Sequence, residues 1–295
     1  MLELRRLRLL HELSLRGTLA SVAEALSYSP STVSQQLAQL EKDAGVPLLV
    51  ADGRRVRLTE HGAMLAAHAA RALELDEQVR GDLESLRTGT APVQVAVMQT
   101  VSQSLLAPAL TLLRDHDPDV VVAVTELPPE EGLFELAARR FDLVVAEQYP
   151  GHSRAHPTGI ERTEIGRDAI RLAVRRGEPA RDLDALRGRP WVMEPSGTAS
   201  RQWATQQCRA AGFEPDVRFE IADLTVHVRL IAAGLAVGLL PDLARAPGRK
   251  ELTLVDLPGS PAREVFAATR TSSTRPAIAA VRTALKDAFT ARTAR

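Results

Sequence analysis

Short polar side chains gather on one face of a helix that the sequence predicts over Ser29 to Gly45. Ser29 can cap this helix, and Pro30 suits its first position, where no backbone N–H is needed. An apolar stripe with helical spacing marks the buried side: Val33, Leu37 and Leu40. The residues predicted to contact DNA are Pro30, Ser31, Thr32, Ser34, Gln35 and Gln39. Hydroxyls and amides can hydrogen-bond base edges and phosphates when a helix lies in the major groove, although a solvated helix face has the same composition.

Three arginines follow this helix closely: Arg54, Arg55 and Arg57. The pair Asp52-Gly53 is a strong hairpin signal between the apolar run 46–50 and the alternating stretch 54–59, which predicts a two-stranded wing. Beside a recognition helix, these guanidinium groups could bind phosphates or enter an adjacent minor groove. The alternative is a charged hairpin edge that only resists aggregation.

Three turns between a predicted strand and a predicted helix could hold a small ligand. They are Gln99-Thr100-Val101-Ser102, Ser196-Gly197-Thr198 and Asp223-Leu224-Thr225. Helix N-termini at the carboxyl ends of strands offer free N–H groups, which suits an anionic or hydrogen-bonding molecule. Glu147, at the end of another predicted strand, could add an acceptor for a polar or cationic ligand. The same hydroxyls could simply cap helices, and Glu147 could be a solvated loop acid.

The sequence offers little for catalysis or metal binding. It lacks HExxH, P-loop and GxSxG motifs, and Cys208 has no histidine nearby in sequence. A single cysteine also excludes an intrachain disulfide and a cysteine-based zinc site. His152 and His156 stand in a loop, where their spacing fixes no geometry. No catalytic residue, metal site or cofactor is therefore predicted.

The composition sets further bounds. At 295 residues the chain is long enough for two or three domains, and its 37 basic and 37 acidic residues give no net charge. Only three of the basic residues are lysine, a composition bias that lowers the weight given to any isolated arginine. The N-terminus lacks the uninterrupted apolar core of a signal peptide, and polar residues interrupt the uncharged stretch 88–113, so we expect a soluble, cytoplasmic protein without a membrane span.

Predicted elements place these residues in three regions. Helices over 4–15 and 19–26 precede the polar helix, which gives a helix-turn-helix followed by the wing. A long helix then reaches from 59 to 86, with a seam spaced by four and three residues: Leu65, Ala69, Ala72, Asp76, Val79, Leu83 and Leu86. The seam favours a partner helix, but Asp76 keeps open the alternative that the helix packs on its own domain. From Pro92 onward, strands and helices alternate in two rounds, as in parallel βαβ units.

The stretch from Gly17 to Gly62 resembles the winged helix of LysR-type transcriptional regulators. The matching marks are Ala23 and Leu26, Val33-Ser34 with Gln36, Leu40-Glu41, Gly45-Val46-Pro47-Leu48, and Arg54-Arg55-Val56-Arg57-Leu58-Thr59 before Gly62. Val22 replaces a common alanine, and Leu49-Val50-Ala51 replaces the common aromatic and arginine of the wing. The segment from Leu230 to Pro241, with Asp223-Leu224-Thr225 and Phe141-Asp142-Leu143-Val144-Val145, resembles the effector domain of the same family.

The resemblance implies an α/β protein with an N-terminal winged helix-turn-helix, a long linker helix and a two-lobed effector domain like a periplasmic binding protein. The implied boundaries are 1–58, 59–89 and 90–295, with lobe I at 91–163 and 269–295 and lobe II at 164–268. The implied partners are double-stranded DNA, a small-molecule effector and further copies in a homodimer or homotetramer. Two alternatives stay open: an enzyme or solute receptor whose N-terminal helices only dimerise, and a constitutive DNA-binding protein whose second half binds a protein.

Overall fold

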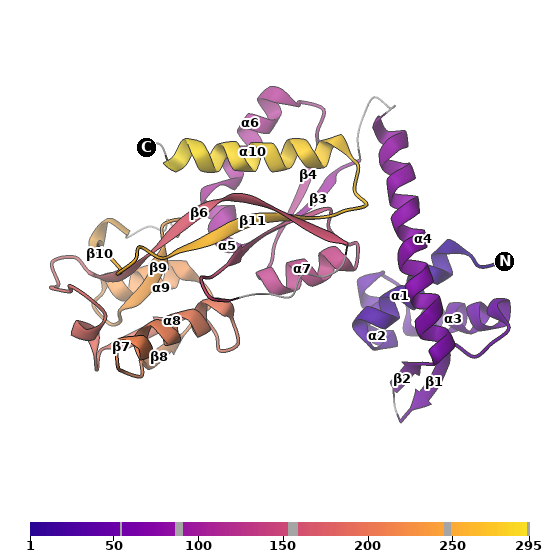
Figure 1. Cartoon of the computed structure of the whole chain (residues 1–295), viewed down its shortest axis with the longest axis horizontal. Helices are drawn as coiled ribbons and strands as arrows, with labels where there is room; N and C mark the ends of the chain where they lie inside the picture. Colours follow the sequence, from indigo (N-terminus) through magenta and orange to yellow (C-terminus); the bar gives the residue numbers. More distant parts are fainter. Residues whose placement is uncertain (54, 86–90, 153–158, 245–248, 294–295) are drawn as a thin grey trace. The chain divides into compact units, whose positions relative to one another are not determined.

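A computed structural model describes residues 1–53, 55–85, 91–152, 159–244 and 249–293. The chain forms two compact units (Figure 1): unit 1 contains Met1–Arg87 with Ser272–Arg275, and unit 2 contains Thr88–Thr271 with Pro276–Arg295. Within the described ranges, no helix is both long and apolar enough to cross a membrane. Each unit has its own hydrophobic core and is treated separately below.

Unit 1 is a winged helix-turn-helix followed by a long helix. Its elements are α1 (Leu4–Arg16), α2 (Leu19–Ala25), α3 (Pro30–Ala44), β1 (Leu49–Asp52), β2 (Arg55–Leu58) and α4 (Glu60–Ser85). Thr18 caps α2 by accepting from the Ser21 N–H, and Ser29 caps α3 by accepting from the Thr32 N–H. Gly17 and Gly45 end α1 and α3 in the left-handed conformation that favours glycine. These local signals explain why the sequence fixes the helix boundaries closely.

The recognition helix and the wing are joined through one carboxylate. Glu41 of α3 accepts hydrogen bonds from the backbone N–H groups of Leu48 and Leu49, at 2.8 and 2.9 Å. Gly62, at the start of α4, lies against the Leu48 carbonyl, and a Cβ there would collide with that oxygen. α3, the wing and α4 therefore hold one another in place, which positions any DNA-contacting side chain.

Unit 2 contains two α/β lobes that share long strands. The seven-stranded sheet has the order β10-β6-β11-β5-β3-β4, with β9 also paired to β6. Its strands are β3 (Val93–Val97), β4 (Val122–Glu126), β5 (Leu143–Gln148), β6 (Ile160–Arg175), β9 (Gly238–Pro241), β10 (Leu252–Asp256) and β11 (Ala262–Arg270). β3 pairs in parallel with β4 and β5, whereas β11 runs antiparallel to β5 and β6. The predicted βαβ units of the first round are confirmed.

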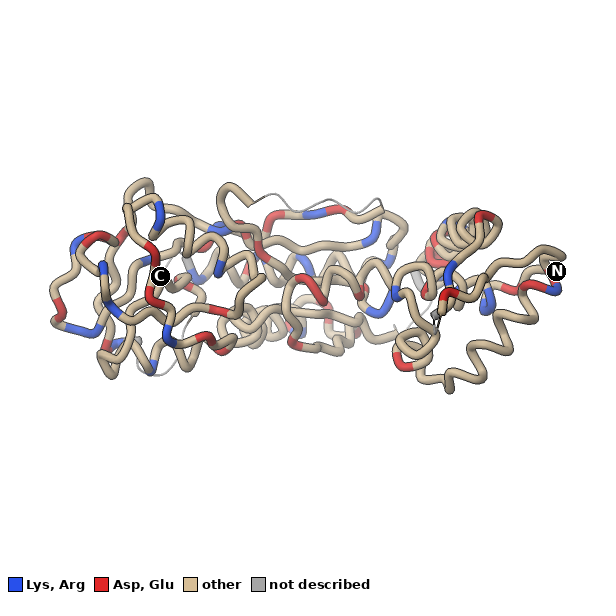
Figure 2. The backbone as a smooth tube through the Cα atoms, turned by 90° about the horizontal axis from the view of Figure 1, so that it is seen from below, with Lys and Arg blue, Asp and Glu red and all other residues tan. Residues whose placement is uncertain are grey.

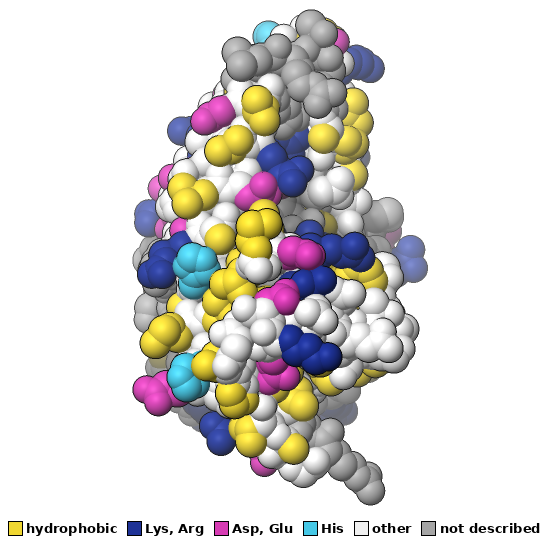
Figure 3. Space-filling view, turned by 90° about the vertical axis from the view of Figure 1, so that its right-hand side faces the viewer, with side chains coloured by type: hydrophobic (Ala, Val, Ile, Leu, Met, Phe, Trp, Pro, Cys, Tyr) yellow, Lys and Arg dark blue, Asp and Glu magenta, His cyan; other side chains and the backbone are white. Residues whose placement is uncertain are grey.

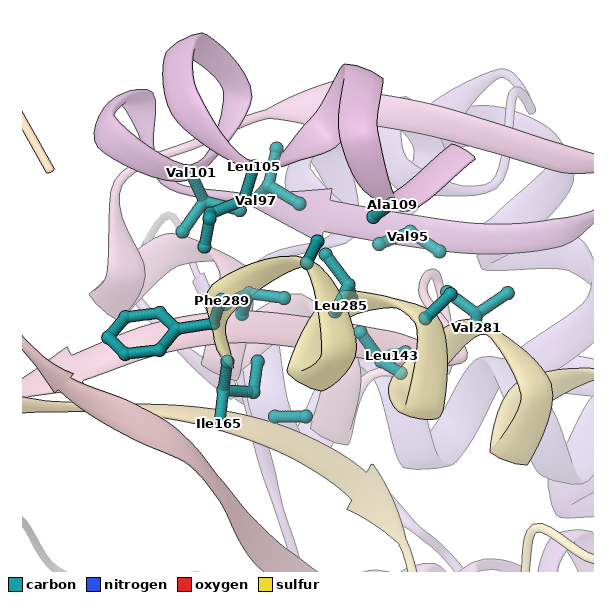
Figure 4. Close-up of a cluster of buried hydrophobic side chains, with 14 of the residues drawn as sticks. Val95, Val97, Val101, Leu105, Ala109, Leu143, Ile165, Val281, Leu285 and Phe289 are labelled. Atoms are coloured by element: carbon teal, nitrogen blue, oxygen red, sulfur yellow. The ribbon is translucent and has the colours of Figure 1, made fainter. Parts of the chain in front are cut away.

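Lobe I, in this structure, is built on β3, β4, β5, β11 and the first part of β6. α5 (Gln99–Ser104), α6 (Leu106–His116) and α10 (Pro276–Thr293) cover one face of this sheet, and α7 (Pro129–Ala137) covers the other (Figure 1). Figure 4 shows Leu285 of α10 between β3, which bears Val95 and Val97, and Leu143 of β5, and it shows Phe289 of α10 near Ile165 of β6. Gly166 of β6 leaves room for the Phe289 ring, into which a Cβ would project.

Lobe II is built on the remaining strands. β7 (Pro190–Met193) pairs in parallel with β8 (Asp216–Glu220), and α8 (Ala199–Ala210) and α9 (Leu224–Ala232) flank them. Two short 3-10 helices, η1 (Asp184–Leu186) and η2 (Arg249–Glu251), complete the lobe. Trp191 and Trp203 are buried in one core with Cys208, as expected for core residues rather than a cofactor platform.

The structure departs from the sequence prediction in several places. The alternating pattern predicts that the second round opens with a strand over 169–175, but β6 begins at Ile160, and the pattern predicts neither α5 nor β10. β6 changes partners after Ala169, which pairs with Ala262 of β11, and Ile170 pairs with Pro241 of β9. The strands therefore pass from one lobe to the other near 169–170 and 261–262, several residues from the boundaries implied by the resemblance. In α4, Leu65 and Ala69 of the predicted seam pack into the core of unit 1 instead of facing a partner.

Candidate DNA-binding and effector sites

The polar face of α3 is exposed where the sequence predicts DNA contacts. Val33, Leu37 and Leu40 are fully buried, which fixes the rotation of the helix. Pro30, Ser31, Ser34 and Gln35 are exposed, and Thr32 and Gln39 are half-buried. Basic and acidic residues are intermixed along the whole chain in Figure 2, so the polar composition of this face matters more than any general positive charge.

Hydrogen bonds within unit 1 divide these predicted contacts into two groups. Ser31 and Thr32 share hydrogen bonds with Ser29 at 2.8 Å, and Gln39 donates to Asp43 at 2.9 Å. Ser34 and Gln35, in contrast, make no side-chain hydrogen bond to the described part of the chain. These two side chains are the most available to read bases.

The side chain of one of the three predicted wing arginines, Arg57, is described by the structure. Arg57 is exposed on β2 and pairs in register with Val50 of β1. Arg55 lies in β2 opposite Asp52, and Arg54 falls outside the described residues. The hairpin itself is confirmed, and contact between its arginines and DNA remains a prediction.

An exposed apolar stripe runs along α4. Met64 is 70 % exposed, Leu75 63 %, Val79 56 % and Leu83 55 %. Exposed hydrophobic side chains are drawn in yellow in Figure 3, where they lie among charged ones. Val79 and Leu83 belong to the predicted seam, and Asp76 of that seam forms an ion pair with Arg80 at 2.7 Å. The predicted seam is therefore divided between the unit's own core and this exposed stripe.

A cavity of about 500 Å³ lies between the two lobes of unit 2. Its lining includes five of the residues that the sequence predicts to bind an effector: Gln99, Thr100, Glu147, Thr198 and Asp223. The other five do not line it: Val101, Ser102, Ser196, Gly197 and Thr225. All three of the predicted strand-to-helix turns therefore contribute residues to one cavity between the lobes.

The hydroxyl and amide groups at these turns are largely used within the protein. Thr198 caps α8 by accepting from the Arg201 N–H, and Asp223 caps α9 by accepting from the Thr225 N–H. Gln99 crosses between the lobes: it donates to Asp223 at 2.8 Å and accepts from the Leu224 N–H at 3.0 Å. The N-terminus of α9 is therefore occupied by a glutamine amide.

A buried arginine that the sequence analysis did not single out stands at the cavity floor. Arg263 of β11 is 2 % exposed and donates to Glu147 at 2.9 Å, to Asp168 at 3.0 and 2.9 Å, and to Thr100 at 2.8 Å. Asp168 also accepts from the Leu243 N–H at 2.9 Å. Burial opposes the charge on Arg263, but the carboxylates of Glu147 and Asp168 outweigh it and raise the pKa of the guanidinium. Arg263 therefore stays charged and is held by both acids.

Three further carboxylates line the cavity. Glu126 ends β4, Glu130 lies in the first turn of α7, and Glu194 follows β7. Burial and, to a smaller extent, the negative charge of Glu147 together raise the pKa of Glu194 to about 7. None of these three acids was predicted. Glu126 ends its strand much as Glu147 ends β5, so the same strand-end argument could have found it.

Comparison with known proteins identifies the class. Residues 87–290 match the family model described as LysR substrate binding domain, and residues 4–63 match the bacterial regulatory helix-turn-helix protein, lysR family. The chain belongs to the LysR family of transcriptional regulators. It combines a DNA-binding winged helix-turn-helix with a two-lobed domain that binds a small-molecule effector.

Several relatives match most of the chain. The HTH-type transcriptional activator IlvY of Salmonella typhimurium is 26 % identical, covering 75 % of this chain and 76 % of the relative. The DNA-binding transcriptional dual regulator OxyR of Escherichia coli is 27 % identical, covering 80 % and 78 %. A full-length OxyR variant from Pseudomonas aeruginosa has the same fold, with a TM-score of 0.68, 21 % identity and coverage of 97 % and 95 %. CbnR bound to its target DNA gives a TM-score of 0.55, with 24 % identity and coverage of 97 % and 99 %.

Proposed function

We propose that this regulator reads its operator through the N-terminal part of α3 and binds its effector in the cavity between the lobes of unit 2. The observation that carries the proposal is the exposed polar face of α3, which lies beside a hairpin that bears Arg57. On this face the side chains of Ser34 and Gln35 make no hydrogen bond to any residue that the structure describes. The wing arginines contact phosphates, which supplies affinity, while α3 contacts bases, which supplies sequence preference.

Salt dependence tests the wing. Replacing Arg54, Arg55 and Arg57 together with alanine should weaken binding to every DNA sequence, because phosphate contacts carry no sequence information. The slope of log affinity against log salt should flatten by up to about 0.9 for each lost contact. The control is Arg80→Ala, which removes an exposed arginine of α4 that is paired with Asp76. An unchanged slope in the triple variant would show that the wing does not contact the backbone.

The exposed stripe of α4 supports a homodimer. A second copy would cover Leu75, Val79 and Leu83, and a two-fold pair would present two copies of α3 to two half-sites. Covering the exposed part of each of these side chains favours association, because it removes apolar surface from water.

Introducing charge on this stripe tests the dimer. Leu75→Glu combined with Val79→Glu should convert the dimer to monomer, because the new carboxylates would face like charges across the two-fold axis. Light scattering coupled to gel filtration measures the mass directly. Leu235→Glu is the matched control, since Leu235 is 54 % exposed but lies in unit 2. A double variant that keeps the dimer mass would place the interface elsewhere.

A response to oxidants through a thiol is not favoured for this chain. Cys208 is the only cysteine of the sequence and is fully buried. Burial raises the pKa of its thiol to about 12, with a smaller contribution from Glu214. The thiolate, which is the reactive form, is therefore scarce at neutral pH. We propose instead an effector held by non-covalent contacts in a cytoplasmic regulator without catalytic activity.

A further inference from the structure

The interlobe cavity is strongly acidic. Five carboxylates line it, Glu126, Glu130 and Glu147 from lobe I and Glu194 and Asp223 from lobe II. Arg263 is the one basic residue among the described residues of the lining. Four of the five acids stand at or just after the carboxyl end of a strand, where α/β proteins bind their ligands.

Arg263 does not offset these acids. Its guanidinium is bound by Glu147 and by Asp168, which itself is 3 % exposed, so two carboxylates already compensate its single charge. Arg201 of α8 lies outside the lining, where it pairs with Glu220 at 3.3 Å and donates to the Glu194 carbonyl. Neither arginine is placed to receive an anionic ligand.

Most of the remaining lining is apolar, although Gln99, Thr100, Thr198 and Ser200 also contribute. Met98, Leu127, Pro128 and Pro129 line it from lobe I, and Ala199 and Leu224 from lobe II. A volume of about 500 Å³ suits a small organic molecule. The lining therefore combines a hydrocarbon surface with oxygen acceptors that carry negative charge.

We propose that the effector of this regulator is a small organic cation, a primary amine or guanidinium compound with a hydrocarbon body. This inference rests on the proposed function, in which the cavity is the effector site. It reverses the expectation from helix N-termini alone, which favoured an anion: the N-terminus of α9 already holds the Gln99 amide.

Charge also explains how such a ligand would act on the lobes. Without a cation, the carboxylates of lobe I and lobe II repel one another, and Glu126, Glu130 and Asp223 do so while exposed to solvent. Burial is the largest cause of the raised pKa of Glu194, and the negative charges of Glu147 and Glu130 across the cavity raise it further. A cation held between them attracts both lobes, so it binds the closed arrangement better than an open one and shifts the equilibrium toward closure.

An organic cation fits better than a metal ion. No group of three or more metal-ligating side chains occurs in the part of the chain that the structure describes. Ca²⁺ and Mg²⁺ need several oxygen ligands at short distance from a single point. Carboxylates spread over two lobes suit instead an extended molecule with one or two charged ends.

Calorimetric titration of the full-length protein at neutral pH tests the ligand class with matched probes. 1,4-Diaminobutane is compared with butane-1,4-diol and succinate, and benzylamine with benzyl alcohol and benzoate; agmatine supplies a guanidinium. We expect saturable binding of at least one amine or guanidinium probe, and none of the alcohols or carboxylates. Binding by the carboxylates without the amines, or no binding of any amine probe, would overturn the inference.

Variants locate the binding. Glu126→Gln with Glu130→Gln should weaken the bound amine about tenfold or more, since two negative charges are removed from the lining. Glu131→Gln is the matched control, because Glu131 is exposed in the same first turn of α7 but does not line the cavity. Wild-type amine affinity in the double variant would overturn the inference. An amine that binds at these residues without altering operator affinity would confirm the ligand class but contradict the proposed effector role.

Discussion

Replacing Arg263 with methionine is expected to lower the free energy of unfolding of unit 2 by about 3–5 kcal/mol. The loss arises because the substitution leaves Glu147 and Asp168 buried without the cation that both of them bind. Urea unfolding followed by tryptophan fluorescence measures it, since both tryptophans of the chain, Trp191 and Trp203, lie in the core of lobe II.

The dependence on pH distinguishes this cause from a simple packing defect. Even with Arg263 present, burial raises the pKa of Asp168 above its ordinary 3.8, and losing the cation must raise it further. A carboxyl group whose pKa is higher in the folded than in the unfolded state costs stability above its unfolded pKa, and the cost disappears as pH falls below it. The gap between variant and wild type should therefore narrow as pH falls toward about 4.

A matched triple variant completes this test. Arg263→Met combined with Glu147→Gln and Asp168→Asn removes all three charges, so no charge is left unpaired in the core. We expect it to regain more than half of the stability that Arg263→Met loses. If the single variant is as stable as wild type, or if the triple variant is no better than the single one, the ion-pair cluster does not stabilise the fold.

The N-terminal unit could be predicted closely because its signals are local. Thr18 and Ser29 start helices, and Gly17 and Gly45 end them, through hydrogen bonds within a few residues of the chain. The partner of the α4 seam could not be predicted in the same way, because a helical repeat shows which residues share a face but not what covers that face. Leu65 and Ala69 are covered by the unit's own core, whereas Leu75, which stood outside the seam, is exposed.

The full length of β6 in unit 2 could not be predicted from the sequence. The part of β6 that pairs with β11, residues 160–169, carries five charged residues. It could not be recognised as a strand because its partner strand lies about a hundred residues later in the chain. β10 is a strand of five residues held by the second half of β6. Short strands of this kind depend on distant partners, which a local pattern does not reveal.

The sequence predicted the position of the candidate effector site, but it did not predict the charges of the residues that line the cavity. The rule that ligands bind at the ends of strands correctly singled out residues that line one cavity: Gln99, Thr100, Glu147 and Asp223. It could not show that Arg263 lies beside Asp168, 95 positions away in sequence. In an arginine-rich chain an isolated arginine is a weak signal of function. The buried and ion-paired Arg263 therefore could not be distinguished in the sequence from the other arginines.

Sequence preference on DNA should depend on Ser34 and Gln35. Both are exposed on the first turns of α3, and each good contact to a base edge contributes about 1–3 kcal/mol of discrimination. In a dimer each contact occurs twice, so Ser34→Ala with Gln35→Ala should reduce the ratio of specific to nonspecific affinity by well over tenfold. Binding of the operator and of a scrambled duplex, measured at the same salt concentration, gives this ratio.

Exposed residues of the same types away from α3 are the controls for this prediction. Ser14→Ala removes a hydroxyl from α1, and Gln202→Ala removes an amide from α8. Neither should change the ratio. Because Val33, Leu37 and Leu40 hold α3 in the core and Ser29 caps it, the loss of Ser34 and Gln35 side chains should leave the fold and the nonspecific affinity nearly unchanged. If operator and scrambled DNA weaken equally, these two side chains contact phosphates only, and bases are read by another part of unit 1.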